Sequence, residues 1–186
     1  MPDLPADAGI VLTGLARRAI EAALGGGPRP AYEPGWLTEP GAAFVTLTQG
    51  ERLRGCIGSL TAYRPLGDDV VDNAVAAATR DPRFPAMTAE ELGRTHVEVS
   101  VLSAPEPFPV TSETDALARL RPGVDGVILT YGSHRGTFLP QVWEQLPGPA
   151  DFLNQLKRKA GLPADWWDLG VRLERYTATP FHEEEP

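Results

Sequence analysis

Two pairs of short apolar segments, each joined by a tight turn that contains glycine, constrain the fold of this chain more than any other feature. The turns lie at Gln49-Gly50-Glu51 and at Gly132-Ser133. The segments that they join are residues 42–47, 52–57, 126–131 and 136–139. Parallel strands need a crossover connection of a dozen or more residues, so turns this short predict two antiparallel β-hairpins.

The spacing of apolar residues predicts the other elements. Valine occupies every second position from Val97 to Val101, which indicates a half-buried strand over 95–103. A last strand is expected over 169–176. Apolar residues three or four positions apart predict helices at 7–24, 65–79, from 88 onward, 112–120, 141–146 and 151–160. Together these elements favour an α+β fold, a two-lobed α/β arrangement in which flanking helices cover a mainly antiparallel or mixed sheet.

Length and composition fit one domain. The chain has 186 residues, of which 42% are hydrophobic and 23% charged, values that allow a substantial core. We expect a single domain over residues 1–186, with a length that allows two lobes. Three consecutive glutamates near the end predict a solvated acidic tail at 183–186.

Charge and hydropathy exclude several classes of protein. The net charge is −8, and the only basic run is Lys157-Arg158-Lys159, so a nucleic-acid partner is not expected. No apolar run reaches the ~18 residues of a membrane span, and no secretory signal is visible. A single cysteine cannot form an intramolecular disulfide. These features predict a cytoplasmic protein without a membrane partner.

The histidines do not predict a metal site. His96 lies on the polar face of a predicted strand, His134 in a hairpin turn and His182 near the chain end. None is spaced with cysteine or acidic residues as zinc ligands are. We therefore expect no metal and no cofactor.

The segment Leu53-Arg54-Gly55-Cys56-Ile57-Gly58 carries the strongest chemical signal. Alternation along a strand would place Leu53, Gly55 and Ile57 toward the core, and Arg52, Arg54 and Cys56 on the opposite face. An adjacent guanidinium lowers the pKa of a thiol and raises its reactivity. The two glycines would let a ligand approach the backbone closely. The alternative is a structural Cys56, because free cysteine is commonly buried as a small apolar residue.

A second cluster is Asp81-Pro82-Arg83-Phe84-Pro85. The prolines stiffen a loop that would present an acid, a cation and an aromatic ring to a ligand. In the alternative, Asp81 and Arg83 pair locally and Phe84 fills the core.

The third cluster is the segment from Arg135 to Val142. It supplies Arg135 as a further candidate anion contact, although a strand followed by a helix start explains the same residues. The two hairpins could also bring Cys56 and His134 together as a nucleophile and base.

These motifs occur in an order that resembles the AMME chromosomal region (AMMECR) domain family. The resemblance covers about residues 8–182 and rests on residues 53–58, 81–84, 97–103 and 135–144. It implies a two-lobed α/β fold with the Arg-Gly-Cys-Ile-Gly segment lining a cleft. The signature positions that it carries over are Arg54, Gly55, Cys56, Ile57, Gly58, Asp81, Arg83 and Phe84.

The family includes the A component of the AmmeMemoRadiSam system. The resemblance therefore implies two protein partners, a Memo-like protein similar to extradiol dioxygenases and a radical S-adenosylmethionine protein. The resemblance does not imply a particular chemical reaction.

Two functional hypotheses follow. In the first, the protein is an enzyme or enzyme component that binds a small polar or anionic molecule. Cys56 is then the nucleophile or a contact residue, Arg54 activates the thiol, and Asp81 is an acid, base or orienting group. Gly55, Ile57, Gly58, Arg83, Phe84 and Arg135 would contact the ligand. In the second, the chain is a non-catalytic partner domain for the Memo-like and radical proteins.

Overall fold

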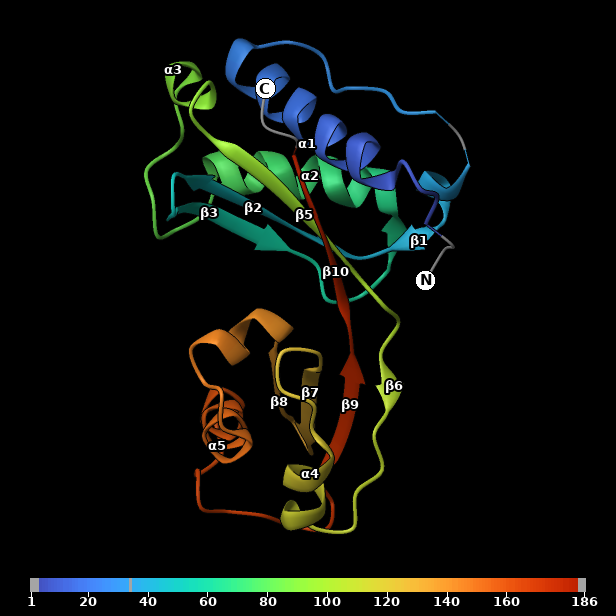
Figure 1. Cartoon of the computed structure of the whole chain (residues 1–186), viewed down its shortest axis with the longest axis vertical. Helices are drawn as coiled ribbons and strands as arrows, with labels where there is room; N and C mark the ends of the chain where they lie inside the picture. The colour runs from blue at the N-terminus through green and yellow to red at the C-terminus, as the bar shows by residue number, and fades with distance from the viewer. Residues whose placement is uncertain (1–3, 34, 184–186) are drawn as a thin grey trace. The chain divides into compact units, whose positions relative to one another are not determined.

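The computed structural model describes residues 4–33 and 35–183 and separates into two compact units (Figure 1). The first unit comprises Met1–Leu102 and Thr179–Pro186, and the second comprises Ser103–Ala178. Helices and antiparallel sheets make up both, which confirms the predicted α+β fold. That the two units form a single domain stays a prediction.

The first unit contains a four-stranded sheet in the order β10-β5-β2-β3. Its strands are β2 (Ala43–Gln49), β3 (Arg52–Gly58), β5 (His96–Leu102) and β10 (Ala178–His182). Two short strands, β1 (Pro40–Gly41) and β4 (Arg64–Pro65), pair with each other. The helices are α1 (Ala8–Gly25), α2 (Leu66–Thr79), α3 (Ala89–Leu92) and the 3₁₀ helix η1 (Trp36–Thr38).

Helices α1 and α2 cover one face of this sheet (Figure 1). The strands direct alternate side chains to that face, where Val45 and Leu47 of β2 meet Val97 and Val99 of β5. Leucine and isoleucine of α1 and the alanine-rich face of α2 complete the core. The remaining side chains of β2, β3 and β5 lie on the opposite face, which these helices do not cover.

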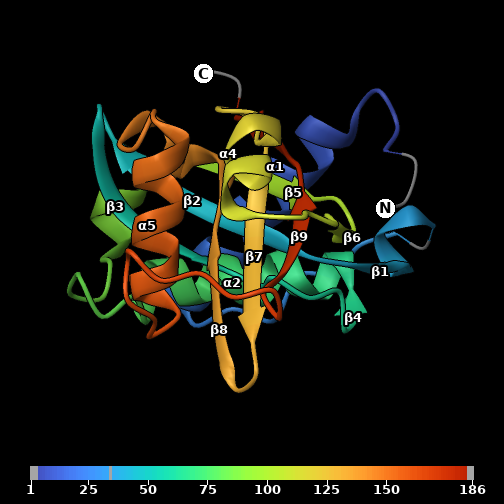
Figure 2. The same cartoon turned by 90° about the horizontal axis from the view of Figure 1, so that it is seen from below.

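The second unit contains another four-stranded sheet, in the order β6-β9-β7-β8. Its strands are β6 (Glu106–Pro107), β7 (Gly126–Tyr131), β8 (His134–Phe138) and β9 (Arg172–Tyr176). Its helices are α4 (Glu113–Arg119), η2 (Pro140–Glu144) and α5 (Pro149–Lys159). Figure 2 shows α5 alongside β8, and its Phe152 stacks on Trp143 with ring centroids 3.8 Å apart.

Two elements of the second unit differ from the prediction in type or in their first residue. The helix expected at 141–146 is the 3₁₀ helix η2, and the last predicted strand begins at Arg172 instead of residue 169. A turn delays it, because Asp168 accepts hydrogen bonds from the amides of Gly170 and Val171 at 2.7 and 3.1 Å.

The predicted solvated acidic tail is wrong at Glu183. Strand β10, which the apolar pattern did not predict, brings the chain back to β5. The Glu183 carboxylate forms an ion pair with Arg17 of α1 and accepts a hydrogen bond from the Val97 amide at 3.3 Å. Residues 184–186 lie outside the described residues.

Strand β3 departs from simple alternation through a β-bulge. Leu47 pairs with Gly55 and the next residue, Thr48, pairs with Leu53, so Arg54 is an extra residue in the ladder. Leu53 is consequently 41% exposed, whereas Arg54 is only 9% exposed. The prediction that Leu53 faces the core, with Arg54 on the other face, is wrong for this reason.

Both glycines of the motif are sites of close packing. A Cβ at Gly55 would lie 2.1 Å from the carbonyl oxygen of Ala77 in α2, and one at Gly58 would lie 2.2 Å from the Phe44 ring. The absence of a side chain at Gly55 thus lets α2 approach β3. Close packing therefore accounts for glycine at both positions, where close approach of a ligand was predicted.

The substitution Gly55→Ala tests this packing. It should lower the free energy of unfolding by about 3 kcal/mol, because the backbone of α2 must shift to admit one methyl group. The matched control is Gly25→Ala at the end of α1, where a Cβ meets nothing within 4 Å. The control should leave stability unchanged or raise it by up to about 1 kcal/mol. Urea unfolding measures both, and an equal effect of the two substitutions would contradict the packing argument.

Candidate functional site

The Cys56 side chain lies on the face of the first sheet opposite α1 and α2. Its Sγ is 3.4 Å from Oγ1 of Thr46, its partner on β2, and Thr46 in turn pairs with Glu98 of β5. Next to Glu98, His182 of β10 lies with Nδ1 3.5 Å from Oε2 of Glu98. Cys56, Thr46, Glu98 and His182 therefore form one line across the four strands, called the polar row below.

An ion pair holds the outer edge of β3 at Cys56. The Asp81 carboxylate accepts a hydrogen bond from the Cys56 amide at 2.8 Å, and Nη2 of Arg83 donates to the Cys56 carbonyl at 3.2 Å. Arg83 also binds Asp81 through Nε and Nη2, at 2.9 and 2.7 Å. The pair thus occupies the hydrogen-bonding groups that an edge strand leaves open.

This arrangement fixes the ionisation of Asp81. The hydrogen bonds from Arg83, together with that from the Cys56 amide, hold the pKa of the Asp81 carboxyl far below its usual range despite its burial. A group that stays ionised at neutral pH is poorly suited to exchange protons. Asp81 therefore positions the Cys56 backbone and Arg83. Of the two alternatives for this cluster, local pairing is the one that the structure contains.

Arg54 belongs to a different set of contacts. The bulge directs it toward α3, where Nε and Nη2 bind the two oxygens of Glu91 at 2.9 and 3.1 Å. Its Nη1 is buried and has no hydrogen-bond partner among residues 4–33 and 35–183. The Phe84 ring packs against this guanidinium 5.9 Å from its central carbon, and Arg83 lies 5.6 Å from the same ring. Phe84 is half-buried between the two arginines.

The thiol of Cys56 is not activated by Arg54. Burial is the largest influence and raises the pKa of Cys56, and the charges of Asp81 and Glu98 raise it further. Thr46 and Arg83 act in the opposite direction and are outweighed. The expectation that Arg54 lowers this pKa is wrong, because the bulge pairs Arg54 with Glu91.

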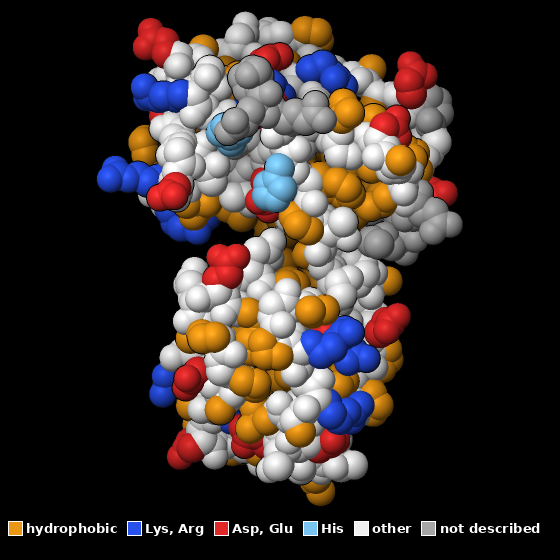
Figure 3. Space-filling model, in the orientation of Figure 1, with side chains coloured by type: hydrophobic (Ala, Val, Ile, Leu, Met, Phe, Trp, Pro, Cys, Tyr) orange, Lys and Arg blue, Asp and Glu red, His pale blue; other side chains and the backbone are white. Residues whose placement is uncertain are grey.

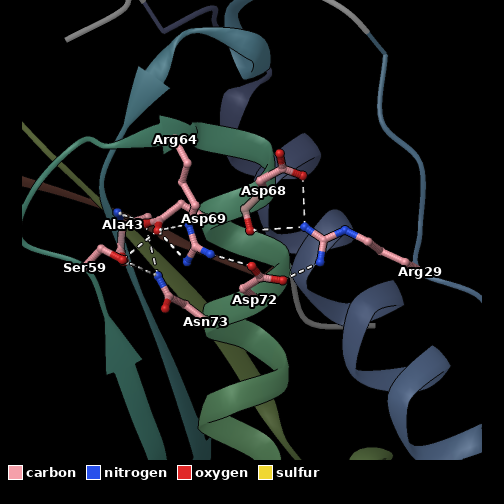
Figure 4. Close-up of polar contacts among 8 residues, drawn as sticks. All are labelled: Arg29, Ala43, Ser59, Arg64, Asp68, Asp69, Asp72 and Asn73. Atoms are coloured by element: carbon pink, nitrogen blue, oxygen red, sulfur yellow. Dashed lines mark hydrogen bonds and ion pairs between the residues drawn. The ribbon is translucent and has the colours of Figure 1, made fainter.

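A buried carboxylate anchors the chain where β3 ends (Figure 4). Asp69 of α2 accepts hydrogen bonds from the Ser59 hydroxyl at 2.6 Å, the Ala43 amide at 2.9 Å and Nε of Arg64 at 2.8 Å. Asn73 donates to the same carboxylate at 3.0 Å. This network fixes the start of β2 and the end of β3 against α2.

Charged contacts continue outward from Asp69 along α2 (Figure 4). Arg64 also pairs with Asp72, and Arg29 pairs with both Asp72 and Asp68. These arginines are therefore already neutralised by carboxylates of α2, and we assign the network to stabilising the first unit.

Ile57 and Arg135 occupy other environments. Ile57 packs against the core of the first unit, on the side that α1 and α2 cover. Arg135 lies on β8 of the second unit, opposite Thr130. His134 is also in the second unit, with Nδ1 3.0 Å from the Ala160 carbonyl. A cleft lined by Arg54 and Arg135, and a couple between Cys56 and His134, stay predictions.

Several contacts of the site were not predicted from the sequence. Glu91 belongs to a capping box with Thr88, and this spacing predicted the start of α3. The same spacing did not predict that Glu91 also binds Arg54. Glu98 was placed on the polar side of its strand. Its alignment with Thr46 and Cys56 depends on the register of three strands.

Metal and membrane features were searched within the described ranges. No group of three or more histidine, cysteine, aspartate or glutamate side chains there is arranged to hold a metal ion. No helix in those ranges is long and apolar enough to cross a membrane.

The chain is similar to known proteins over nearly its whole length. The AMMECR1 family pattern matches residues 13–181. A protein from Methanothermobacter thermautotrophicus is 42% identical over 186 residues, which cover 97% of each chain. A protein from Thermofilum pendens is 38% identical over 205 residues, covering all of this chain and 94% of the other. The crystal structure of an uncharacterised protein from Pyrococcus horikoshii matches with a TM-score of 0.85 and 38% identity, over 96% of this chain and 92% of that one.

The contact between Arg54 and Glu91 predicts a pH-dependent stability. Hydrogen bonds from Arg54 and from the Thr88 amide lower the pKa of Glu91 to about 2. A carboxyl whose pKa is lower in the folded state stabilises that state above its unfolded pKa of ~4.3, and this contribution disappears as the pH falls toward 2. Relative to Glu91→Gln, the wild type should be more stable by about 1–3 kcal/mol at pH 6, and the difference should vanish near pH 2.

Urea unfolding at several pH values measures this difference. The control is Glu90→Gln, at an exposed neighbour that forms no ion pair or side-chain hydrogen bond with the described residues. A difference between wild type and Glu91→Gln that stays constant from pH 6 to pH 2 would show that the contact with Arg54 does not hold.

Proposed function

Because the chain belongs to the AMMECR1 family, as the order of its motifs predicted, we propose that it binds a small polar or anionic molecule at Cys56. In this proposal the ligand lies along the polar row of the first unit, and Cys56 contacts it as a neutral thiol. The observation that carries the proposal is the alignment of Cys56, Thr46 and Glu98 on the sheet face opposite the helices.

The polar row supplies hydrogen-bonding groups at regular intervals. Adjacent strands lie ~4.8 Å apart, so a ligand of two or three bonded units can contact Cys56, Thr46 and Glu98 in turn. Glu98 also accepts a hydrogen bond from Ser100 at 3.0 Å, which fixes its carboxylate beside the row. A sheet holds these groups in place with little loss of side-chain freedom on binding.

Arg83 provides the contact for an acceptor or anionic group at the β3 end of the row. Its side chain is 52% exposed, and among the described contacts its hydrogen bonds use Nε and Nη2. Nη1 therefore retains two N–H groups for a ligand. Because Asp81 neutralises most of the charge of Arg83, hydrogen bonding contributes more than net charge to this contact.

The geometry favours binding over nucleophilic catalysis. A cysteine nucleophile needs a low thiol pKa or a base within hydrogen-bond reach. Burial raises the pKa of Cys56, and its hydrogen-bonding neighbour is the Thr46 hydroxyl, which is not a base at neutral pH. The chain could still act as an enzyme component if a protein partner supplied the catalytic groups. The resemblance names a Memo-like and a radical S-adenosylmethionine protein, and a partner domain for these remains the alternative function.

A thermal-shift screen tests the proposal with a panel of small carboxylates, phosphates, amides and polyols. At least one compound should raise the melting temperature of the wild type by about 2 °C or more, because a ligand of the folded state stabilises it. Thr46→Val should reduce that shift by more than half, and Glu98→Gln should do so where the compound donates a hydrogen bond to the Glu98 carboxylate. Cys56→Ser should retain it, since a hydroxyl can replace a neutral thiol as a contact.

The control for the screen is Thr79→Val, which removes a hydroxyl whose partner among the described residues is the Val75 carbonyl of the same helix, at 2.7 Å. The control should respond like the wild type. If no compound stabilises the wild type, or if Thr46→Val and Thr79→Val respond equally, the polar row is not the binding site.

A further inference from the structure

A hollow in the second unit separates strand β9 from the segment that follows β6. Phe108 donates its amide hydrogen to the Leu173 carbonyl at 2.8 Å, and the next residue, Pro109, has no N–H to continue the ladder. The chain therefore leaves β9 after Phe108. The resulting hollow has a volume of about 510 Å³, within the ~300–1,000 Å³ range of small-molecule sites.

The lining of this hollow combines an apolar wall with opposite charges. Pro107, Pro109 and Val110 form the wall on one side. Arg172 and Glu174 of β9 lie on the other. Hydrophobic side chains also gather on the face of the second unit that Figure 3 presents, with charged side chains among them.

The two charged side chains have no partners within the unit. Neither Arg172 nor Glu174 forms an ion pair or a side-chain hydrogen bond with any residue in 4–33 or 35–183. Glu174 is half-buried. A cationic ligand group beside Glu174 would replace the water contacts that this carboxylate has lost through partial burial.

The strand geometry sets the spacing of these groups. Arg172 and Glu174 are two residues apart on one strand, so they share a face and their Cα atoms are ~6.8 Å apart. Thr130 lies directly across from Arg172 on β7 and adds a hydroxyl on the same face. At this spacing, one positive and one negative side chain can bind the carboxylate and the ammonium of a ligand in which both groups are attached to the same carbon atom.

We propose that this hollow is a binding site for a free α-amino acid with an apolar side chain. The α-carboxylate binds Arg172 and the Thr130 hydroxyl, the α-ammonium binds Glu174, and the apolar side chain packs on Pro107, Pro109 and Val110. The site is complete within the second unit and does not rest on the function proposed for the polar row.

Isothermal titration calorimetry of the full chain with L-leucine tests the proposal. Leucine should bind, and N-acetyl-leucine and leucine amide, which each lack one charge, should bind about tenfold or more weakly. Glycine should also bind at least tenfold more weakly, because it has no side chain to pack on the wall. The dipeptide Leu-Gly, whose two charges are further apart, should behave like the weak ligands.

Replacing either charged residue should abolish the preference for leucine over the derivative that lacks the matching charge. Glu174→Gln should bind leucine and N-acetyl-leucine with similar affinity, and Arg172→Gln should bind leucine and leucine amide with similar affinity. The controls are Arg158→Gln and Glu144→Gln, at exposed positions of the same unit outside the hollow, and both should bind leucine like the wild type. Absence of leucine binding at millimolar concentration, or equal binding of leucine and its two derivatives, would overturn the proposal.

Discussion

One extra residue in β3 determines what each face of the first sheet carries. Because Arg54 is bulged out of the ladder, it lies with the helices and binds Glu91, while Cys56 stays on the opposite face beside Thr46. A regular strand would have placed the guanidinium and the thiol on one face. The bulge thus explains why Arg54 pairs with Glu91 and is absent from the polar row, while burial, Asp81 and Glu98 raise the pKa of Cys56.

The fold was largely predictable because its signals are local. Short turns identify the hairpins, and valine alternation identifies β5, since each depends on residues close in sequence. Strand β10 was missed because its pairing with β5 joins residues more than 70 positions apart. The bulge was missed because Leu53, Gly55 and Ile57 also satisfy a regular alternation.

The sequence predicted which residues of the candidate site to examine, but not the partners of their side chains. The motif around Cys56 and the loop from Asp81 to Phe84 do meet, through the Cys56 amide and carbonyl. Their roles depend on carboxylates distant in sequence, such as Glu91 for Arg54 and Asp69 for Ser59. The motif glycines illustrate the same limit, because only the structure reveals Ala77 and Phe44 in the space above them. Charge pairing and packing thus account for residues whose types also suit ligand binding.

Titration of the Cys56 thiol shows whether the bulge keeps Arg54 away from it. The chain has one cysteine, so labelling with [3-¹³C]cysteine gives a single carbon signal whose shift follows ionisation of the thiol. Because the thiol is partly buried and Arg54 is paired with Glu91, the titration midpoint should lie above the ordinary thiol pKa of ~8.5 and be unchanged in Arg54→Gln. A midpoint below that value in the wild type, rising when Arg54 is replaced, would place the guanidinium beside the thiol and show that the bulge does not separate them.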